Sequence, residues 1–217
     1  MEYLNAFYNA FIQSLNWTWK AIIFDVPWYL NYFWGLILIS LIVWCLEIFF
    51  PWRKDQSKFR KDFWLDGFYM FFNFFIFSIA ISGFYKVITL LLNDFGLKSS
   101  FFSIIDLSQL PIYIQLLVFF VILDFFQWFT HVLLHKYSFL WHFHKIHHSV
   151  KEMGFAAHLR YHWMENIFYK PLKTLAVMLI GGFEPEHAYV VHFIAITIGH
   201  LNHANIKITW GPFKYIF

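Results

Sequence analysis

Histidine side chains are concentrated in one segment of the chain, at spacings that suit a metal site. His131 and His135 are four residues apart, so on a helix their imidazoles lie on one face, one turn apart. His144, His147 and His148 repeat this pattern at intervals of three and four residues. Five imidazoles presented from two helical stretches can converge on metal ions, and these five are the first candidate ligands.

The distribution of histidine along the chain supports a functional role. All twelve histidines lie between His131 and His203, and the first 130 residues contain none. A single buried histidine is usually an ordinary core residue. A dozen in one half of a very apolar chain are better explained by a task, because polar groups at a bilayer are costly.

The available donor atoms restrict the choice of metal. The single cysteine, Cys45, lies in an apolar run, so the chain offers neither an intrachain disulfide nor a thiolate site. Imidazole and oxygen ligands suit iron, zinc, copper or manganese. The candidate imidazoles outnumber the three or four ligands of one zinc ion, which favours two metal ions. Two irons beside a bilayer would suit activation of O₂ and attack on an unactivated C–H bond of a lipid.

Two later stretches supply further candidates. His158 and His162 are four residues apart, and Glu165 follows three residues later. A site role for this stretch and an amphipathic helix on the membrane surface explain the pattern equally well. His200 and His203 are three apart, and we prefer His203 because it ends the last apolar stretch. His162 and His203 therefore join the candidate metal ligands.

Asp124 stands in the same apolar segment, seven residues before His131. A carboxylate there is costly unless it has a partner. Metal-bound histidines usually donate their second ring N–H to a carboxylate or carbonyl, which fixes the tautomer. We therefore expect Asp124 to orient an imidazole rather than to bind metal. His142 lies two residues before His144, off the shared helical face, and we do not count it as a ligand.

The composition is that of an integral membrane protein. Of the 217 residues, 60% are hydrophobic and only 13% are charged, which is too apolar for a soluble domain. The net charge of +3 is small, and the Lys and Arg residues lie beside apolar runs. They indicate membrane orientation, and they argue against nucleic acid as a partner. We expect an all-α fold, a polytopic membrane helical bundle with a histidine-rich metal site.

Three long apolar runs, 29–50, 68–92 and 112–134, are each long enough to cross ~30 Å of hydrocarbon as a helix. Shorter apolar pieces in 172–204 predict a helical hairpin. The loop after the first run is the most basic in the chain, which places it in the cytoplasm by the positive-inside rule. Counting spans from this loop puts the histidines on the same side.

The whole chain, 1–217, is expected to be one membrane domain whose catalytic-type region is 124–217. If the source is bacterial, the membrane is the inner, cytoplasmic one, with the metal site facing the cytosol.

The residues from Asp124 to Ser149 resemble the sterol desaturase / fatty acid hydroxylase superfamily of membrane di-iron oxygenases. That family carries D-x-x-x-(Y/W)-x-x-H-x-x-x-H and then L-W-x-x-H-x-x-H-H-S. The matching residues here are Asp124, Trp128, His131, His135, Leu140, Trp141, His144, His147, His148 and Ser149. Two later family patterns, L-R-x-H-x-x-E and H-(A/S)-N-I, are matched by Leu159, Arg160, His162, Glu165, His203, Ala204, Asn205 and Ile206.

The resemblance covers the chain from about Phe63 to its end. It implies a helical membrane fold, a cytosol-facing centre of two Fe ions for which Zn could substitute, O₂ as oxidant and a lipid substrate. It also implies an electron donor, which the sequence does not identify. Hydroxylation and desaturation are both open.

One departure concerns the end of the chain. The family carries a third cluster, H-x-x-H-H, shortly after the H-A-N-I stretch, whereas this sequence stops at Phe217. We expect this 217-residue form to be incomplete, to bind metal weakly and to turn over little. A histidine-rich membrane transporter for zinc or iron is an alternative, with Asp124 and Lys86 as polar residues along its path. A non-catalytic lipid-binding scaffold is a third possibility.

Overall fold

The structure, a computed structural model, describes residues 1–96, 105–181 and 185–212. These residues form helices apart from one short parallel pair of strands, β1 (Ile105–Asp106) and β2 (Ile180–Gly181). The predicted all-α architecture is confirmed, together with a group of histidines that could hold a metal ion.

The first two helices are joined through one side chain. Helix α1 (Glu2–Ile22) packs along α4 (Phe77–Asp94), and the short 3₁₀ turn η1 (Trp28–Leu30) leads into α2 (Tyr32–Phe49). Asn31 caps α2, because its side-chain oxygen accepts from the Trp34 amide at 3.2 Å. Its amide nitrogen donates to the carbonyl of Ala21 at 2.9 Å, which fixes the end of α1 against the start of α2.

The next segment is one long helix interrupted by a π-helical turn. Helix α3 (Phe63–Phe71), the π turn η2 (Phe72–Ile76) and α4 (Phe77–Asp94) follow one another without a break. Single π turns inside α-helices are frequent at functional sites. Asn73 in this turn is buried and donates to the carbonyl of Tyr161 at 2.8 Å. The π turn therefore holds the segment that carries several of the later histidines.

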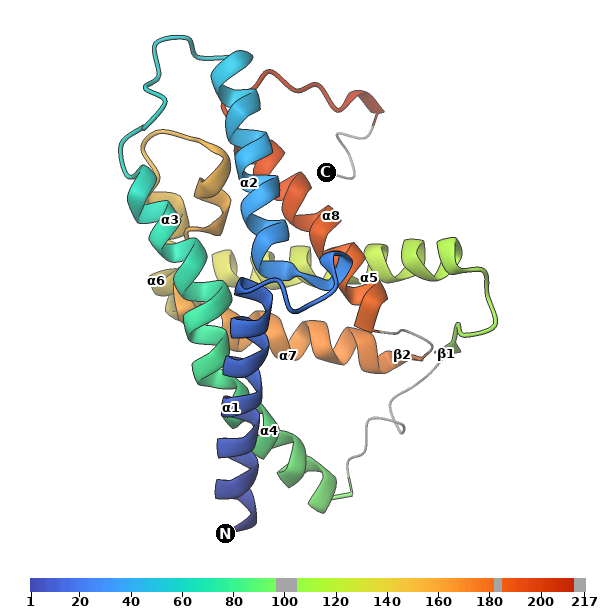
Figure 1. Cartoon of the computed structure of the whole chain (residues 1–217). Coiled ribbons are helices and arrows are strands. Elements are labelled where there is room, and N and C mark those ends of the chain that lie inside the picture. The colour runs from blue at the N-terminus through green and yellow to red at the C-terminus, as the bar shows by residue number, and fades with distance from the viewer. Residues whose placement is uncertain (97–104, 182–184, 213–217) are drawn as a thin grey trace.

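Helix α5 (Ile112–Lys136) begins after Pro111 and lies crosswise to α2, with α7 (Trp163–Leu179) beside it (Figure 1). Between them come α6 (Ser138–His144) and the 3₁₀ turns η4 (His147–Ser149) and η5 (Phe155–Leu159). Helix α8 (Pro185–His203) packs on η5, α2 and α5. The stretch 172–204, expected as a hairpin, contains the second half of α7 and all of α8. Each of these helices packs chiefly on other elements.

Within the described ranges, three helical segments are long and apolar enough to cross a membrane: Tyr32–Phe49, Phe63–Asp94 and Ile112–Lys136. They contain most of the three predicted apolar runs and support a membrane protein. Helices that cross one bilayer tilt by about 20° on average, so typical spans lie within about 40° of one another. Because α5 lies crosswise to α2, the two do not both follow the membrane normal in this arrangement, and the crossing by 112–134 stays a prediction.

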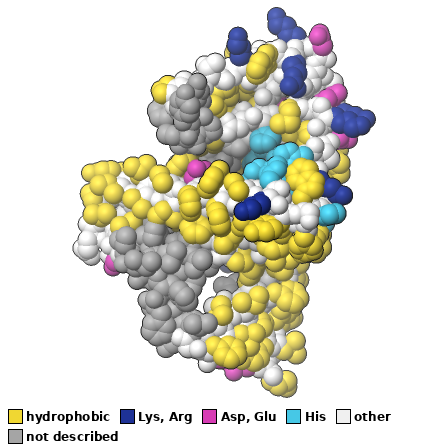
Figure 2. Space-filling model, turned by 180° about the vertical axis from the view of Figure 1, so that it is seen from behind, with side chains coloured by type: hydrophobic (Ala, Val, Ile, Leu, Met, Phe, Trp, Pro, Cys, Tyr) yellow, Lys and Arg dark blue, Asp and Glu magenta, His cyan; other side chains and the backbone are white. Residues whose placement is uncertain are grey.

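The core gathers around η5. Leu36 of α2, Met70 of α3 and Ile196 of α8 surround Leu159, and all four are buried. Many large apolar side chains of α2, α4 and α5 remain exposed, and they give the molecule its mainly apolar surface (Figure 2). The packed interior is therefore small, and it holds in place the turn that carries His158.

Candidate metal centre

A sharp bend after α5 brings two pairs of histidines together. Tyr137 has an extended conformation between α5 and α6, and it turns the chain back on itself. His131 and His135 at the end of α5 thereby face His144 and His148. Figure 2 shows the histidine side chains gathered in one surface patch, beside the apolar surface and next to the end of the molecule where Lys and Arg gather.

The Nε2 atoms of these four histidines converge. The Nε2 atom of His135 lies 3.1 Å from that of His131 and 3.1 Å from that of His148. The Nε2 atoms of His148 and His144 are 3.2 Å apart. The ligand atoms of all four residues lie within 4.8 Å of one another.

This arrangement fits a shared cation. A neutral imidazole nitrogen carries either one hydrogen or one lone pair, so it cannot hydrogen-bond fully to two other ring nitrogens. The Nε2 atoms of His135 and His148 each approach two such nitrogens. With metal–nitrogen bonds of about 2.1 Å, neighbouring ligand atoms stand about 3.0 Å apart at right angles and about 3.4 Å apart in a tetrahedron. The observed spacings of 3.1 and 3.2 Å lie between these values.

A buried carboxylate orients one of the four imidazoles. His144 donates its Nδ1–H to Oε2 of Glu165 at 3.0 Å, and both side chains are 2% exposed. This bond leaves Nε2 of His144 as the ligand atom, which is the usual arrangement at metal-bound histidines. The other Glu165 oxygen accepts from the backbone amide of His162 at 3.3 Å. The carboxylate that orients an imidazole is thus Glu165 of α7, whereas the sequence pattern had indicated Asp124 for this role.

A second group of imidazoles lies next to the first. The rings of His147 and His203 have centroids 5.4 Å apart, and those of His158 and His203 are 5.6 Å apart. His147 donates its Nδ1–H to the carbonyl of Arg160 at 3.3 Å, and His203 donates to the carbonyl of Gly199 at 3.0 Å. In both residues Nε2 is left as the ligand atom.

His158 and His200 belong to the same group, although the sequence analysis did not select them. Their Nδ1 atoms are 3.1 Å apart, and His200 also contacts the Ser40 hydroxyl through Nε2 at 3.1 Å. A Cβ atom at Gly199 would lie 2.6 Å from the ring of His158. Gly199, in the sequence G-H-L-N-H, is a feature that could have indicated this contact. Because it has no side chain, the ring of His158 can lie against α8.

A buried ionic network supports the backbone behind His147. Asp66 is fully buried and accepts from both Arg60 and Arg160, while Arg160 also contacts Asp62 at 3.3 Å. Two guanidinium groups are thus balanced by two carboxylates, as buried charges require. Because the carbonyl of Arg160 accepts from His147, the network fixes the position of that imidazole.

The electrostatics around these histidines favour the neutral form that binds metal. Burial lowers the pKa of His147 to about 3, and the neighbouring His203 adds to the effect. Burial also lowers the pKa of His148, and it holds the pKa of His158 well below its ordinary value. These imidazoles are therefore neutral at physiological pH and available as ligands.

The remaining predicted residues lie outside the group of four. His162 has its ring against Phe143, and its Nδ1 accepts from the backbone amide of Met164 at 3.1 Å. His142 donates its Nδ1–H to the carbonyl of Ser138 and is exposed. Asp124 is exposed on α5, and its electrostatic partner is Lys173 of α7.

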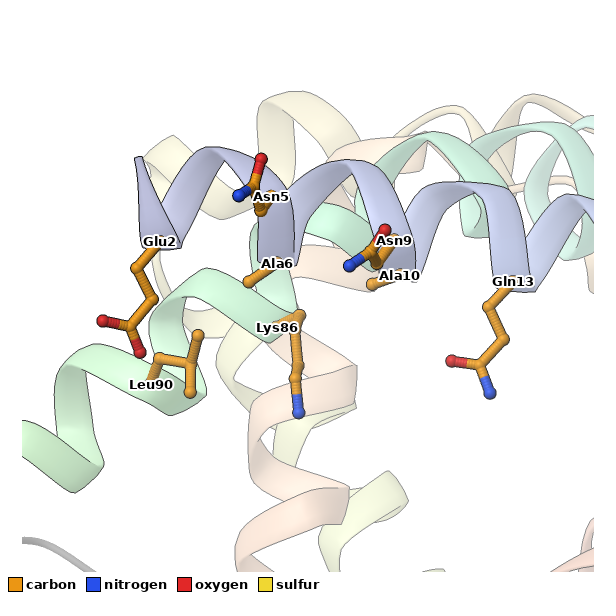
Figure 3. A pocket seen from close by; sticks show the side chains of 8 residues that line it. All are labelled: Glu2, Asn5, Ala6, Asn9, Ala10, Gln13, Lys86 and Leu90. Carbon is orange, nitrogen blue, oxygen red and sulfur yellow. The ribbon is translucent and has the colours of Figure 1, made fainter.

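A surface groove lies on another part of the molecule. A groove of about 580 Å³ between α1 and α4 is lined by polar side chains that include Glu2, Asn9 and Lys86 (Figure 3). Neither helix contains a histidine. The candidate site is therefore defined by the converging donor atoms and not by the shape of the surface.

Comparison with known proteins supports the same part of the chain. Residues 116–217 match the family model described as fatty acid hydroxylase. The ornithine lipid hydroxylase OlsE of Rhizobium tropici is 31% identical over 110 residues, which are 51% of this chain and 33% of that relative. The match thus spans about a third of the length of the curated relative. No solved structure matches the chain significantly.

Residues 116–217 are therefore similar to the fatty acid hydroxylase family, in agreement with the resemblance of the histidine patterns.

Proposed function

We propose that this chain carries the metal centre of a membrane-bound lipid hydroxylase that uses two iron ions and O₂. The observation that carries the proposal is the convergence of four Nε2 atoms within 4.8 Å. The family match and the relative named as an ornithine lipid hydroxylase support a lipid substrate and favour hydroxylation over desaturation.

The two groups of imidazoles suit two separate ions. The first ion would be held by His131, His135, His144 and His148. The second would be held by a set that includes His147 and His203, with His158 beside them and His162 as a further candidate. All donors are nitrogen atoms, which suits iron and would also accept zinc. Iron bound there supplies the binding of O₂ and the one-electron steps that protein side chains cannot provide.

Neighbouring residues of the chain hold these donors in place. Glu165 keeps the proton of His144 on Nδ1, so that Nε2 is available to the ion. The carbonyl of Arg160 does the same for His147. The Trp141 ring packs against His135 and His148 with centroids 5.2 and 5.3 Å away, which restricts the orientations of both imidazoles.

The membrane and a redox partner complete the proposal. A lipid would reach the centre from the bilayer, which the exposed apolar side chains of α2, α4 and α5 contact. Hydroxylation places one oxygen atom of O₂ in the product and reduces the other to water. It therefore requires two electrons from a donor, which we propose to be a separate protein.

The basic loop after α2 supports a cytosolic orientation for the site. Arg60 donates to the carbonyl of Glu152 at 2.9 Å, and the amide of Lys61 donates to the Glu152 carboxylate at 2.9 Å. The loop thus lies against the segment that follows His148. Positively charged loops face the cytosol, so the neighbouring histidines would face it too.

The proposal is tested by expressing the chain in a bacterial host, measuring iron in the purified protein and analysing membrane lipids by mass spectrometry. We expect the wild-type chain, even with weak metal binding and low turnover, to contain more iron and to yield more lipid that has gained one oxygen atom than a host without the chain. His148→Ala should lower both, whereas the control His142→Ala should lower neither, because His142 lies outside the group of four. Equal iron and equal product in wild type and His148→Ala would refute the proposal.

A further inference from the structure

A pair of lysines lies on α7, away from the imidazoles. Lys170 and Lys173 are three residues apart and therefore share one face of the helix. Lys170 donates to the Ser78 hydroxyl of α4 at 3.1 Å and lies 5.7 Å from the centroid of the Tyr85 ring. Lys173 lies 5.6 Å from the centroid of the Tyr169 ring. Both ammonium groups are thus held among α4, α5 and α7 by aromatic and hydroxyl groups.

Neither lysine of this pair forms an ion pair among the described residues. Among the described residues, no carboxylate oxygen lies within 4.0 Å of either ammonium nitrogen. Asp124 acts on Lys173 only through space. The two buried guanidinium groups of the chain, by contrast, are matched by two carboxylates. Partly buried cations in an apolar setting are costly without an anion.

The lysine pair lies on the same helix, α7, as the carboxylate that contacts the candidate metal centre. Lys170 follows Glu165 by five residues on α7, which is about 7.5 Å along the helix axis. Glu165 contacts His144 directly. Both lysines are only partly buried, so a ligand can reach them. An anion bound here would therefore lie one to two turns along α7 from the carboxylate that contacts His144.

We propose that Lys170 and Lys173 bind the anionic head group of the lipid substrate through its phosphate or carboxylate oxygens. The inference rests on the proposed function and adds the substrate class, a lipid with an acidic head group. The Ser78 hydroxyl accepts from Lys170 and donates to the carbonyl of Asn73 at 3.2 Å, so it holds the Lys170 ammonium group in place. Charge-assisted bonds from two ammonium groups would set the position of the lipid chain relative to the imidazoles.

The test measures binding with the full chain in detergent micelles, followed by tryptophan fluorescence. The probes are dioctanoyl phosphatidic acid, dioctanoylglycerol and inorganic phosphate. We expect wild type to bind phosphatidic acid at least about tenfold more tightly than either other probe, as charge-assisted bonds to a lipid anion require. The double variant Lys170→Gln/Lys173→Gln should lose about tenfold or more of this affinity.

Two control variants separate charge at this position from general effects. Lys170→Arg/Lys173→Arg keeps both charges and should retain the preference for phosphatidic acid. Lys145→Gln/Lys151→Gln removes two exposed lysines elsewhere and should bind as wild type does. An equal loss in this control pair, or equal binding of phosphatidic acid and dioctanoylglycerol by wild type, would overturn the inference. Binding of inorganic phosphate as tight as that of phosphatidic acid would overturn its assignment to a lipid.

Bound iron, measured in the same samples, separates this inference from the proposed function. Unchanged iron in Lys170→Gln/Lys173→Gln together with lost phosphatidic acid binding supports the head-group site. Absence of iron from every variant, with the binding preference intact, would refute the proposed function and the substrate role, but not the anion site itself.

Discussion

The bond between Glu165 and His144 gives the sharpest prediction about the metal centre. In Glu165→Gln the side chain keeps its size, but its amide can present N–H groups to Nδ1 of His144. His144 would then accept at Nδ1 and carry its proton on Nε2, which removes the lone pair that the ion needs. The original contact is 3.0 Å long and fully buried, so water cannot replace it.

Loss of such an orienting carboxylate lowers metal affinity by about 10- to 100-fold, or about 1.4 to 2.8 kcal/mol. The assay is competition for Co²⁺ or Fe²⁺ between the purified chain and a coloured chelator. Glu152→Gln is the matched control, because its contact with the Lys61 amide needs only an acceptor oxygen, which glutamine retains. Affinity within about threefold of wild type for Glu165→Gln, in a variant that unfolds at the wild-type temperature, would show that this carboxylate does not set the tautomer.

Three further predictions concern the support of the site. Gly199→Ala should lower the unfolding free energy, measured in denaturant, by about 1–3 kcal/mol, because the added Cβ would meet the ring of His158. Gly67→Ala, whose Cβ would meet nothing within 4 Å, should not lower it. Equal stabilities of the two variants would count against the packing described. Asp66→Asn should cost about 3–5 kcal/mol by leaving buried guanidinium charge unbalanced, and a thermal unfolding midpoint equal to that of wild type would contradict this. Folded His147 stays neutral down to about pH 3, whereas the unfolded residue takes up a proton near pH 6.5. The unfolding free energy of the metal-free chain should therefore fall by about 1.4 kcal/mol per pH unit for this residue as the pH is lowered from 6.5. The same pH dependence in wild type and in His147→Ala would contradict it.

The features that were predictable from the sequence depend on local spacing. The helical period alone places His131 and His135 on one face, and the L-W-x-x-H-x-x-H-H-S pattern identifies His144 and His148. The structure brings these four imidazoles within 4.8 Å of one another, and their role as metal ligands stays a prediction. The apolar runs likewise predict long helices, because length and composition determine whether a helix can cross a membrane.

The features that were not predictable depend on packing between distant segments. Asp124 was expected to face an imidazole, but α5 turns it toward Lys173 of α7. Glu165 takes the orienting role because α7 runs beside α5 and α6. His158 enters the second group only because a glycine on α8 leaves room for its ring. The helical spacing of residues in the sequence does not determine these contacts between helices, because each contact depends on the direction of a helix after the preceding turn.

The central claim is that imidazoles from α5, α6 and η4 share one metal ion. X-ray absorption at the iron edge of the iron-loaded chain tests it most directly. We predict an inner shell of nitrogen atoms with the multiple scattering of imidazole rings, which weakens in His148→Ala and is unchanged in His142→Ala. A shell of oxygen atoms without imidazole scattering would contradict the claim.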